Sequence, residues 1–148
     1  IPLAIFISWT DMRSMKITYS TVVVLLVAYG VLGPFAFGLE MYFWQWLHFP
    51  VVLVISILLW MLRIMGGGDA KLIAAMSPFF VVSDLEVILR LFAACLISAL
   101  IVHRLFMLTP LKRPVAEWKS WDAGGFFPKG FPLSMTLLLY LVFAAIYR

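Results

Sequence analysis

Long apolar runs dominate the chain, and the short turns between them hold most of its charged residues and several of its glycines. None of the runs shows an amphipathic helical period, so their length is the argument for helix. A transmembrane β-barrel would alternate apolar and polar residues over segments of about ten residues, and this chain does not. With about 20 apolar residues needed per span, the pattern predicts membrane-crossing helices at about 1–10, 19–39, 48–64, 66–83, 87–108 and 131–147.

The predicted fold class is therefore all-α: a polytopic integral membrane protein with about six transmembrane helices, in a single domain of residues 1–148, with one polar loop, 109–130. The first run reaches span length only with residues before Ile1. Because the sequence opens Ile-Pro-Leu without Met, we expect residues to precede it. The fourth run reaches span length only when residues 66–71 are included, which places this glycine-rich turn at the membrane edge.

The composition excludes two other broad classes of protein. Of the 148 residues, 65% are apolar and 12% are charged, whereas soluble domains average about 45–50% and about 25%. A soluble domain of this size could not bury so many apolar side chains. A disordered chain needs low hydrophobicity. We therefore expect the chain to be surrounded by membrane lipid.

The positive charges fall mainly on one side of the predicted membrane arrangement. If six spans alternate, the side of the 11–18 turn receives nine of the eleven Lys and Arg residues: Arg13, Lys16, Arg63, Lys71, Arg104, Lys112, Arg113, Lys119 and Lys129. Because Lys and Arg in short loops mark the cytoplasmic side, we assign this side to the cytoplasm. A five-span arrangement with a re-entrant fourth run would move the later basic loop to the wrong side.

Two carboxylates lie at this predicted cytoplasmic membrane edge. Asp11 closes the first run, and Asp69 follows Gly66, Gly67 and Gly68 between the third and fourth runs. Acidic residues so close to hydrocarbon are costly and point to a function. The other five acidic residues lie in outer turns or in the polar loop and are interpreted as solvated charges: Glu40, Asp84, Glu86, Glu117 and Asp122.

The three consecutive glycines allow two interpretations. Glycine lets backbone approach a neighbour closely, and irregular backbone at membrane depth is tolerated where it lines a cavity. The glycines would then cradle a ligand or an extended peptide, with Asp69 at the rim. Alternatively they form a flexible turn, and Asp69 is the N-cap of the next helix. A phosphate-binding loop is disfavoured because the glycine and lysine spacing is wrong and an acid stands where phosphate would lie.

Two aspartates at matching depth permit one specific chemistry. Held a few ångströms apart, two carboxylates cannot both ionise easily, so one keeps a proton. The ionised partner can then take a proton from water, while the protonated one polarises a peptide carbonyl. This chemistry needs no metal. The single cysteine, Cys95, and the widely separated His48 and His103 offer no disulfide and no metal-ligand spacing, so we expect neither metal nor cofactor.

The residues around both aspartates resemble the type IV prepilin peptidases, within the GxGD class of intramembrane aspartic proteases. The segment GGGDAKL at 66–72 is similar to the family's Gly-x-Gly-Asp-x-Lys-Leu, and DMRSMKI at 11–17 is similar to its Asp followed by basic residues and Ile. PKG at 128–130, before the last run, resembles a Pro-x-Gly turn found at that place. In order and spacing, these motifs extend the resemblance over essentially the whole chain.

The sequence departs from the family pattern in two places. The family often has Ile-Pro-Asn after the first aspartate, where this chain has Ile17, Thr18 and Tyr19, so the local turn differs. The paired Cys-x-x-Cys motifs of the longer, bifunctional members are absent from this sequence. The chain therefore resembles the short, peptidase-only branch associated with tight-adherence (Flp) pili, and we expect no methyltransferase domain.

The resemblance implies an endopeptidase of the bacterial inner membrane that removes the short basic leader of a prepilin or pseudopilin, on the cytoplasmic side, after a Gly that precedes a hydrophobic helix. It implies that Asp11 and Asp69 are the catalytic pair. Gly66, Gly67 and Gly68 would let substrate backbone approach. Lys71 is a further candidate for substrate binding, or serves only as a positive anchor at the membrane. We expect no nucleic-acid partner, and the sequence leaves the oligomeric state open.

An alternative from another class is a non-enzymatic transporter subunit or a pilus or secretion assembly scaffold, in which Asp11 and Asp69 relay protons or pair helices. A transporter would more naturally place polar residues at mid-bilayer and show an internal repeat, and neither is evident here. Within the protease class, the signal-peptide-peptidase type carries a Tyr-Asp first motif, whereas Thr10 precedes Asp11 in this chain.

Overall fold

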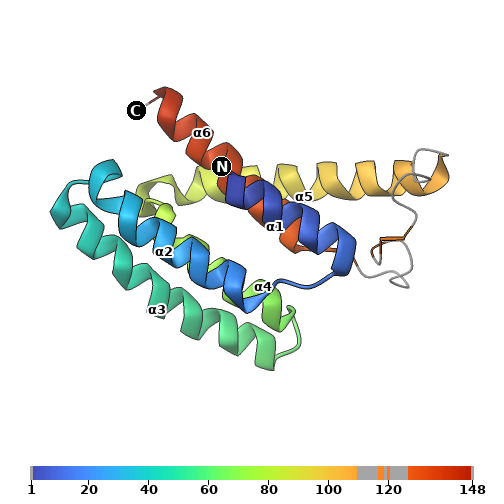
Figure 1. Ribbon diagram of the computed structural model, residues 1–148, viewed down its shortest axis with the longest axis horizontal. Coiled ribbons are helices and arrows are strands. Elements are labelled where there is room, and N and C mark those ends of the chain that lie inside the picture. The colour runs from blue at the N-terminus through green and yellow to red at the C-terminus, as the bar shows by residue number, and fades with distance from the viewer. Residues whose placement is uncertain (1, 110–116, 119, 121–126, 148) are drawn as a thin grey trace. The chain divides into compact units, whose positions relative to one another are not determined.

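The computed structural model describes residues 2–109, 117–118, 120 and 127–147, and within these residues it contains α-helices and short 3-10 turns but no strand (Figure 1). The α-helices are α1 (Pro2–Ser14), α2 (Tyr19–Ala36), α3 (Leu39–Met61), α4 (Gly67–Met76), α5 (Leu85–Leu108) and α6 (Gly130–Tyr147), and the 3-10 turns are η1 (Ser77–Phe79) and η2 (Val82–Asp84). The all-α prediction is confirmed. Of the residues placed in the cytoplasmic loop, Lys112, Arg113, Lys119 and Asp122 lie outside the described residues.

Four helical segments of the described chain are long and apolar enough to cross a membrane: Tyr19–Ala36, Leu39–Met61, Val82–Leu108 and Gly130–Tyr147. The other two helices, α1 and α4, have 13 and 10 residues. At 1.5 Å per residue they rise only about 20 Å and 15 Å, against about 30 Å of hydrocarbon. The chain is a polytopic membrane protein in which two of the six predicted spans are short helices.

The predicted fourth span, 66–83, is interrupted after ten helical residues. α4 ends at Met76, and η1 and η2 follow it. Pro78 contributes to the interruption, because proline lacks the N–H that would continue the helical hydrogen bonds, here to the carbonyl of Ala74. The hydroxyl of Ser77 donates to the carbonyl of Ala74 at 2.7 Å and satisfies one acceptor of the last turn.

The helix that corresponds to the predicted third span, 48–64, begins earlier than the apolar run indicates. α3 starts at Leu39 rather than near His48, so the aromatic residues that precede the run belong to the helix. Glu40 lies in its first turn, where a negative charge is favourable. The second span ends at Ala36, three residues before its predicted end at 39.

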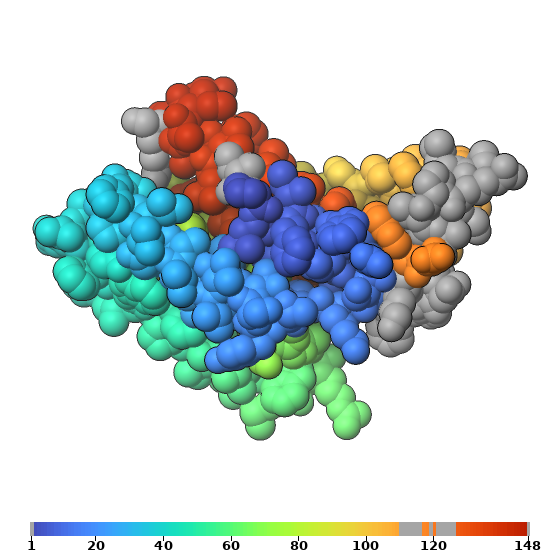
Figure 2. All heavy atoms as spheres, in the orientation of Figure 1, coloured from blue at the N-terminus to red at the C-terminus, as the bar shows by residue number. Residues whose placement is uncertain are grey.

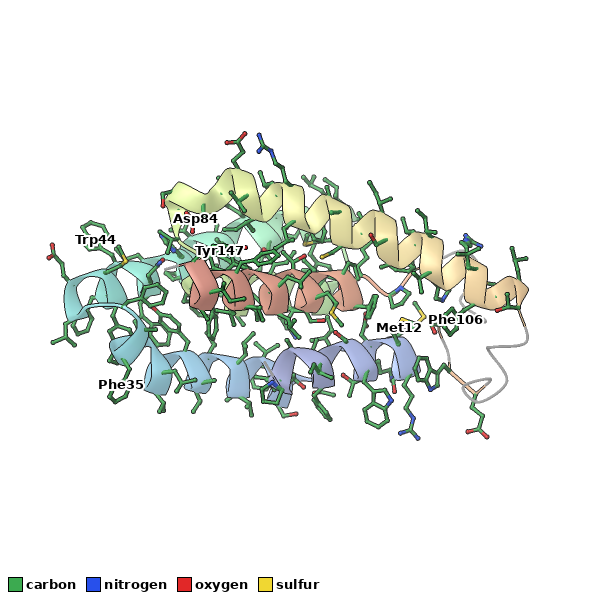
Figure 3. The ribbon with its side chains drawn as sticks, turned by 90° about the horizontal axis from the view of Figure 1, so that it is seen from above. Met12, Phe35, Trp44, Asp84, Phe106 and Tyr147 are labelled. Atoms are coloured by element: carbon green, nitrogen blue, oxygen red, sulfur yellow. The ribbon has the colours of Figure 1, made fainter. Side chains whose placement is uncertain are left out.

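The described chain divides into two compact units, the first made of Ile1–Lys16 with Val87–Arg148 and the second of Ile17–Glu86. In unit 1, α1 and α6 pack side by side (Figures 1 and 3). The buried face of α1 holds residues three and four apart, as one face of a helix requires: Ala4, Ile7, Ser8 and Asp11. On α5, His103 is buried and its ring meets Phe127 edge-on at 5.5 Å.

In unit 2, α4 packs against α2 and α3 and is the most deeply buried helix of the three (Figure 1). Its buried residues are mostly small, which lets the neighbouring helices approach closely: Ala70, Leu72, Ala74, Ala75 and Met76. The outward sides of α2 and α3 expose large apolar side chains, among them Val27, Val31, Phe35 and Trp44. Figure 2 shows atoms of both helices at the surface of the unit, and Figure 3 labels Phe35 and Trp44. Such a surface fits lipid rather than water.

An aromatic cluster holds the other end of unit 2 together. Tyr29 of α2 is 1% exposed. Its ring stacks on Tyr42 at 5.5 Å and meets Trp46 and Phe79 edge-on at 5.3 Å and 5.1 Å. Because Tyr42 and Trp46 belong to α3 and Phe79 to η1, one buried ring joins three elements. At this end, Phe35 and Trp44 point outward from the unit (Figure 3).

Candidate active site

Asp11 lies on the buried face of α1, in the last turn of the helix. It is 4% exposed. A carboxylate with so little exposure requires hydrogen bonds or charged partners to offset the loss of water. Arg13, two residues on, lies on the opposite side of the helix, exposed, with its guanidinium carbon 5.3 Å above the ring of Trp9. Arg13 therefore points away from the buried face that carries Asp11.

The start of α6 supplies a hydrogen-bond donor to Asp11. The backbone N–H of Phe131 donates to Asp11 Oδ2 at 3.1 Å. Phe131 is the second residue of α6, and the first N–H groups of a helix have no partner within it. The positive end of the helix dipole also favours a negative charge there. The Asp11 carboxylate thus occupies an anion-stabilising position at the N-terminus of another helix.

A second contact between α1 and α6 lies one helical turn away from the hydrogen bond between Phe131 and Asp11. Ser8 Oγ and Ser134 Oγ lie 2.7 Å apart, and both serines are buried. Ser8 precedes Asp11 by one turn of α1, and Ser134 follows Phe131 by one turn of α6. The helices are therefore antiparallel, and the end of α1 lies at the start of α6.

Asp69 lies in the first turn of α4, three residues after Gly66. The structure makes Gly66 the N-cap of α4, so the alternative in which Asp69 is the N-cap is wrong. The Asp69 carboxylate folds back toward that glycine, since a Cβ built on Gly66 would lie 3.1 Å from Asp69 Oδ2. An acid in the first turn is stabilised by the helix dipole.

The space beside each of the three glycines is taken by side chains of unit 2. A Cβ on Gly67 would lie 3.3 Å from Trp60 Nε1, and one on Gly68 would lie 3.4 Å from Ile17 Cβ. Close packing within unit 2 therefore accounts for small residues at these positions. Whether the same glycines also receive substrate backbone stays a prediction.

Lys71 is exposed and lies at the cytoplasmic end predicted for α4. Its Nζ is 6.0 Å from the ring centroid of Tyr19, the first residue of α2. This is within the range of a cation–π contact. The start of α2 and the start of α4 therefore lie at the same end of unit 2, as alternating spans require.

The sequence pointed to both aspartates but missed the groups that hold Asp11. Neither the N–H of Phe131 nor the hydroxyls of Ser8 and Ser134 carries a sequence signal for a site. The PKG motif at 128–130 was the one sequence feature that pointed to this region, because it lies at the start of α6, whose Phe131 N–H binds Asp11. Asp11 belongs to unit 1 and Asp69 to unit 2.

The described residues contain no group of three or more His, Cys, Asp or Glu side chains arranged to hold a metal ion. In the comparison with protein families, the model of the type IV leader peptidase family matches residues 1–103. The match includes both aspartates, the three glycines and Lys71. Neither a curated protein nor a solved structure matches the chain.

Proposed function

The chain belongs to the type IV leader peptidase family, and from this premise we propose that it removes the leader peptide of Flp-like type IV prepilins by aspartic catalysis of the GxGD type. The reaction takes place at the cytoplasmic edge of the bacterial inner membrane. Asp11 and Asp69 activate the water.

The observation that carries the proposal is the position of the two acids within the family match. Residues 1–103 include both Asp11 and Asp69. Asp11 is 4% exposed and bound by a backbone N–H, and Asp69 lies in the first turn of α4 beside Gly66. Each carboxylate is thus placed at a helix N-terminus, where a negative charge can persist in an apolar protein.

The proposed chemistry needs one ionised and one protonated carboxyl group. The ionised aspartate takes a proton from water as the water oxygen attacks the scissile carbonyl carbon, and the protonated aspartate gives its proton to the carbonyl oxygen. The resulting diol then collapses. The first aspartate returns its proton to the leaving nitrogen, the second regains one from the diol, and the C–N bond breaks. The products are a carboxylic acid and an amine, and both aspartates recover their initial states.

The substrate proposed for this site is an extended peptide at the membrane boundary. A prepilin presents a short basic leader, then a Gly, then a hydrophobic helix, so its scissile bond lies where water meets lipid. Gly66, Gly67 and Gly68 supply backbone close to Asp69, and the side of these glycines away from Trp60 and Ile17 is where we place the substrate chain. Lys71, one turn into α4, is proposed to bind the backbone carbonyl groups of the substrate.

The test is leader cleavage of a co-expressed Flp-like prepilin whose basic leader ends in Gly. Asp11→Asn and Asp69→Asn each keep the size of the side chain and remove the titrating acid, and we expect each to lower cleavage by at least about a thousandfold. Asp84→Asn, in η2, is the matched control and should cleave normally. Protein amount in the membrane is measured for every variant.

The alternative function makes different predictions in the same experiment. A transporter subunit or assembly scaffold would leave the prepilin uncleaved even with the unmodified chain, and the function of a scaffold would tolerate Asn at either position. If the unmodified chain cleaves and either Asn variant retains near-normal cleavage, the two-aspartate mechanism is wrong for this protein although the peptidase activity stands.

A further inference from the structure

We propose that the N-terminal turn of α6 is a positioning element for catalysis, in which the Phe131 N–H orients and stabilises the ionised Asp11 carboxylate while Ser8 and Ser134 fix the register of α1 against α6. The proposal rests on the proposed function. It adds residues that the motifs around the two aspartates do not contain.

The first argument is the hydrogen bond itself. The Phe131 N–H lies 3.1 Å from Asp11 Oδ2, and hydrogen bonds to an ionised group are stronger than those between neutral groups. Fixing one carboxylate oxygen stops rotation of the side chain, so the direction of the second oxygen is set as well. A catalytic acid or base needs such a fixed direction, because small displacements of a reacting group cost large factors in rate.

The second argument is the serine pair, which sets how α1 and α6 lie against each other. Ser134 is fully buried and Ser8 is 4% exposed. Each hydroxyl has a single proton, and besides the 2.7 Å contact between them, Ser8 can donate to Ala4 O and Ser134 to Gly130 O. Whichever serine donates across, the other donates to its own helix, so all the protons are used.

The third argument is the distance along the chain between the two partners. Asp11 and Phe131 are 120 residues apart, so a local turn cannot create this bond, and only correct packing of α1 on α6 forms it. A slip of either helix by one residue would turn Asp11 away from the first turn of α6. The serine pair opposes that slip.

Among the described residues of α1 and α6, few charged or titratable groups lie near this contact. α6 carries only Tyr140 and Tyr147, both at least nine residues beyond Phe131, and Lys129 directly precedes the helix. On α1 itself, Arg13 faces away over Trp9. In the proposed pair, Asp69 shares the titration with Asp11, so the pH limits of activity belong to the pair.

The experiment removes the donor without removing a side chain that the site uses. Phe131→Pro deletes the N–H, and proline is tolerated in the first turn of a helix. Phe131→Ala is the matched control, because it loses the same ring and keeps the N–H. Cleavage of a purified prepilin by membranes containing equal amounts of each full-length variant is measured as a function of pH.

For Phe131→Pro, we expect one limit of the plot of cleavage rate against pH to move to higher pH by about one unit. This is the scale of change that hydrogen bonding to a charged group produces. Loss of the donor disfavours the ionised form of Asp11, so the pH at which the pair loses its first proton rises, and the acid limit of activity moves to higher pH. Phe131→Ala should keep both limits in place. A merely structural defect lowers the rate at every pH and moves neither limit, and that result would overturn the proposal.

A second pair of variants keeps the test decisive if Phe131→Pro does not accumulate. Ser134→Ala removes the contact with Ser8 and should move the same limit in the same direction by a smaller amount. Thr136→Ala is its control, because the buried Thr136 hydroxyl donates to Pro132 O within α6 and does not reach α1. If Ser134→Ala and Thr136→Ala show the same dependence of cleavage rate on pH, the proposal is overturned. Failure of the unmodified chain to cleave would instead reject the proposed function.

Discussion

The hydroxyl of Tyr42 donates a hydrogen bond of 3.3 Å to the backbone carbonyl of Gly30. Gly30 lies four residues before Pro34, which is inside α2 and has no N–H to donate to that carbonyl. An unpaired backbone carbonyl is costly in lipid. Tyr42, a residue of α3, therefore replaces the helical hydrogen bond that Pro34 removes, and it ties α2 to α3.

Tyr42→Phe should destabilise the protein by about 1 kcal/mol, the usual net value of such a bond between membrane helices. In a chain that also carries Pro34→Ala, residue 34 regains its N–H, and the same Tyr42→Phe change should cost clearly less. Unfolding of the unmodified protein, the two single variants and the double variant in detergent measures this as a double-mutant cycle. An equal cost in both backgrounds would mean that the Tyr42 hydroxyl does not substitute for the missing helical donor.

Gly33 makes the close approach of the same tyrosine possible. A Cβ on Gly33 would lie 2.7 Å from Tyr42 Cδ2, whereas one on Gly30 would lie 3.7 Å from Trp46 Cζ2, an ordinary contact. Gly33→Ala should therefore destabilise the protein by roughly 1–3 kcal/mol through overpacking. Gly30→Ala, in the same helix, should be neutral or stabilising because alanine favours helix.

The measurement for this pair is the midpoint of thermal unfolding in detergent, with cleavage assayed at a low temperature where both proteins are folded. The two alanine variants share the same helix, so their difference reports the contacts of the new Cβ with the rings of Tyr42 and Tyr29 together with its clash with Pro34, the residue that follows. Equal midpoints would show that the ring of Tyr42 can move aside without cost.

The sequence was sufficient to predict the helical class and the order of the helices, because apolar length alone specifies these in lipid. It could not predict that α4 stops at Met76. The apolar run continues through Pro78, and hydropathy does not register that Pro78 lacks the N–H that would continue the helix. It also placed the start of the third span too late, because Glu40 and Gln45 interrupt the apolar pattern while fitting within α3.

The candidate site shows the same limit. Asp11 and Asp69 are visible in the sequence because an acid at a membrane edge is rare. Phe131 is not visible, because its contribution is a backbone N–H that every residue except proline has. Its value arises only from the packing of α1 on α6, and a contact between residues 120 positions apart is set by the fold rather than by local pattern.

Gly66 offers the sharpest test of how Asp69 is placed. A methyl group at Gly66 would lie 3.1 Å from Asp69 Oδ2, so Gly66→Ala should displace the carboxylate by a few tenths of an ångström. Because small misplacements of a catalytic group cost large factors in rate, we expect about a tenfold loss of prepilin cleavage. The substitution leaves the extended backbone of Gly66, with φ −72°, undisturbed.

Gly38→Ala is the matched control for this prediction. Gly38 is the N-cap of α3 as Gly66 is of α4, both have extended backbone, and a Cβ on Gly38 would meet nothing within 4 Å. The two substitutions thus share the cost of alanine at an N-cap and differ in the contact with Asp69. Leader cleavage is measured at equal protein amounts in the membrane. If both variants cleave equally well, Gly66 does not set the position of the Asp69 carboxylate, and the requirement for glycine at this position must come from the substrate side of the turn.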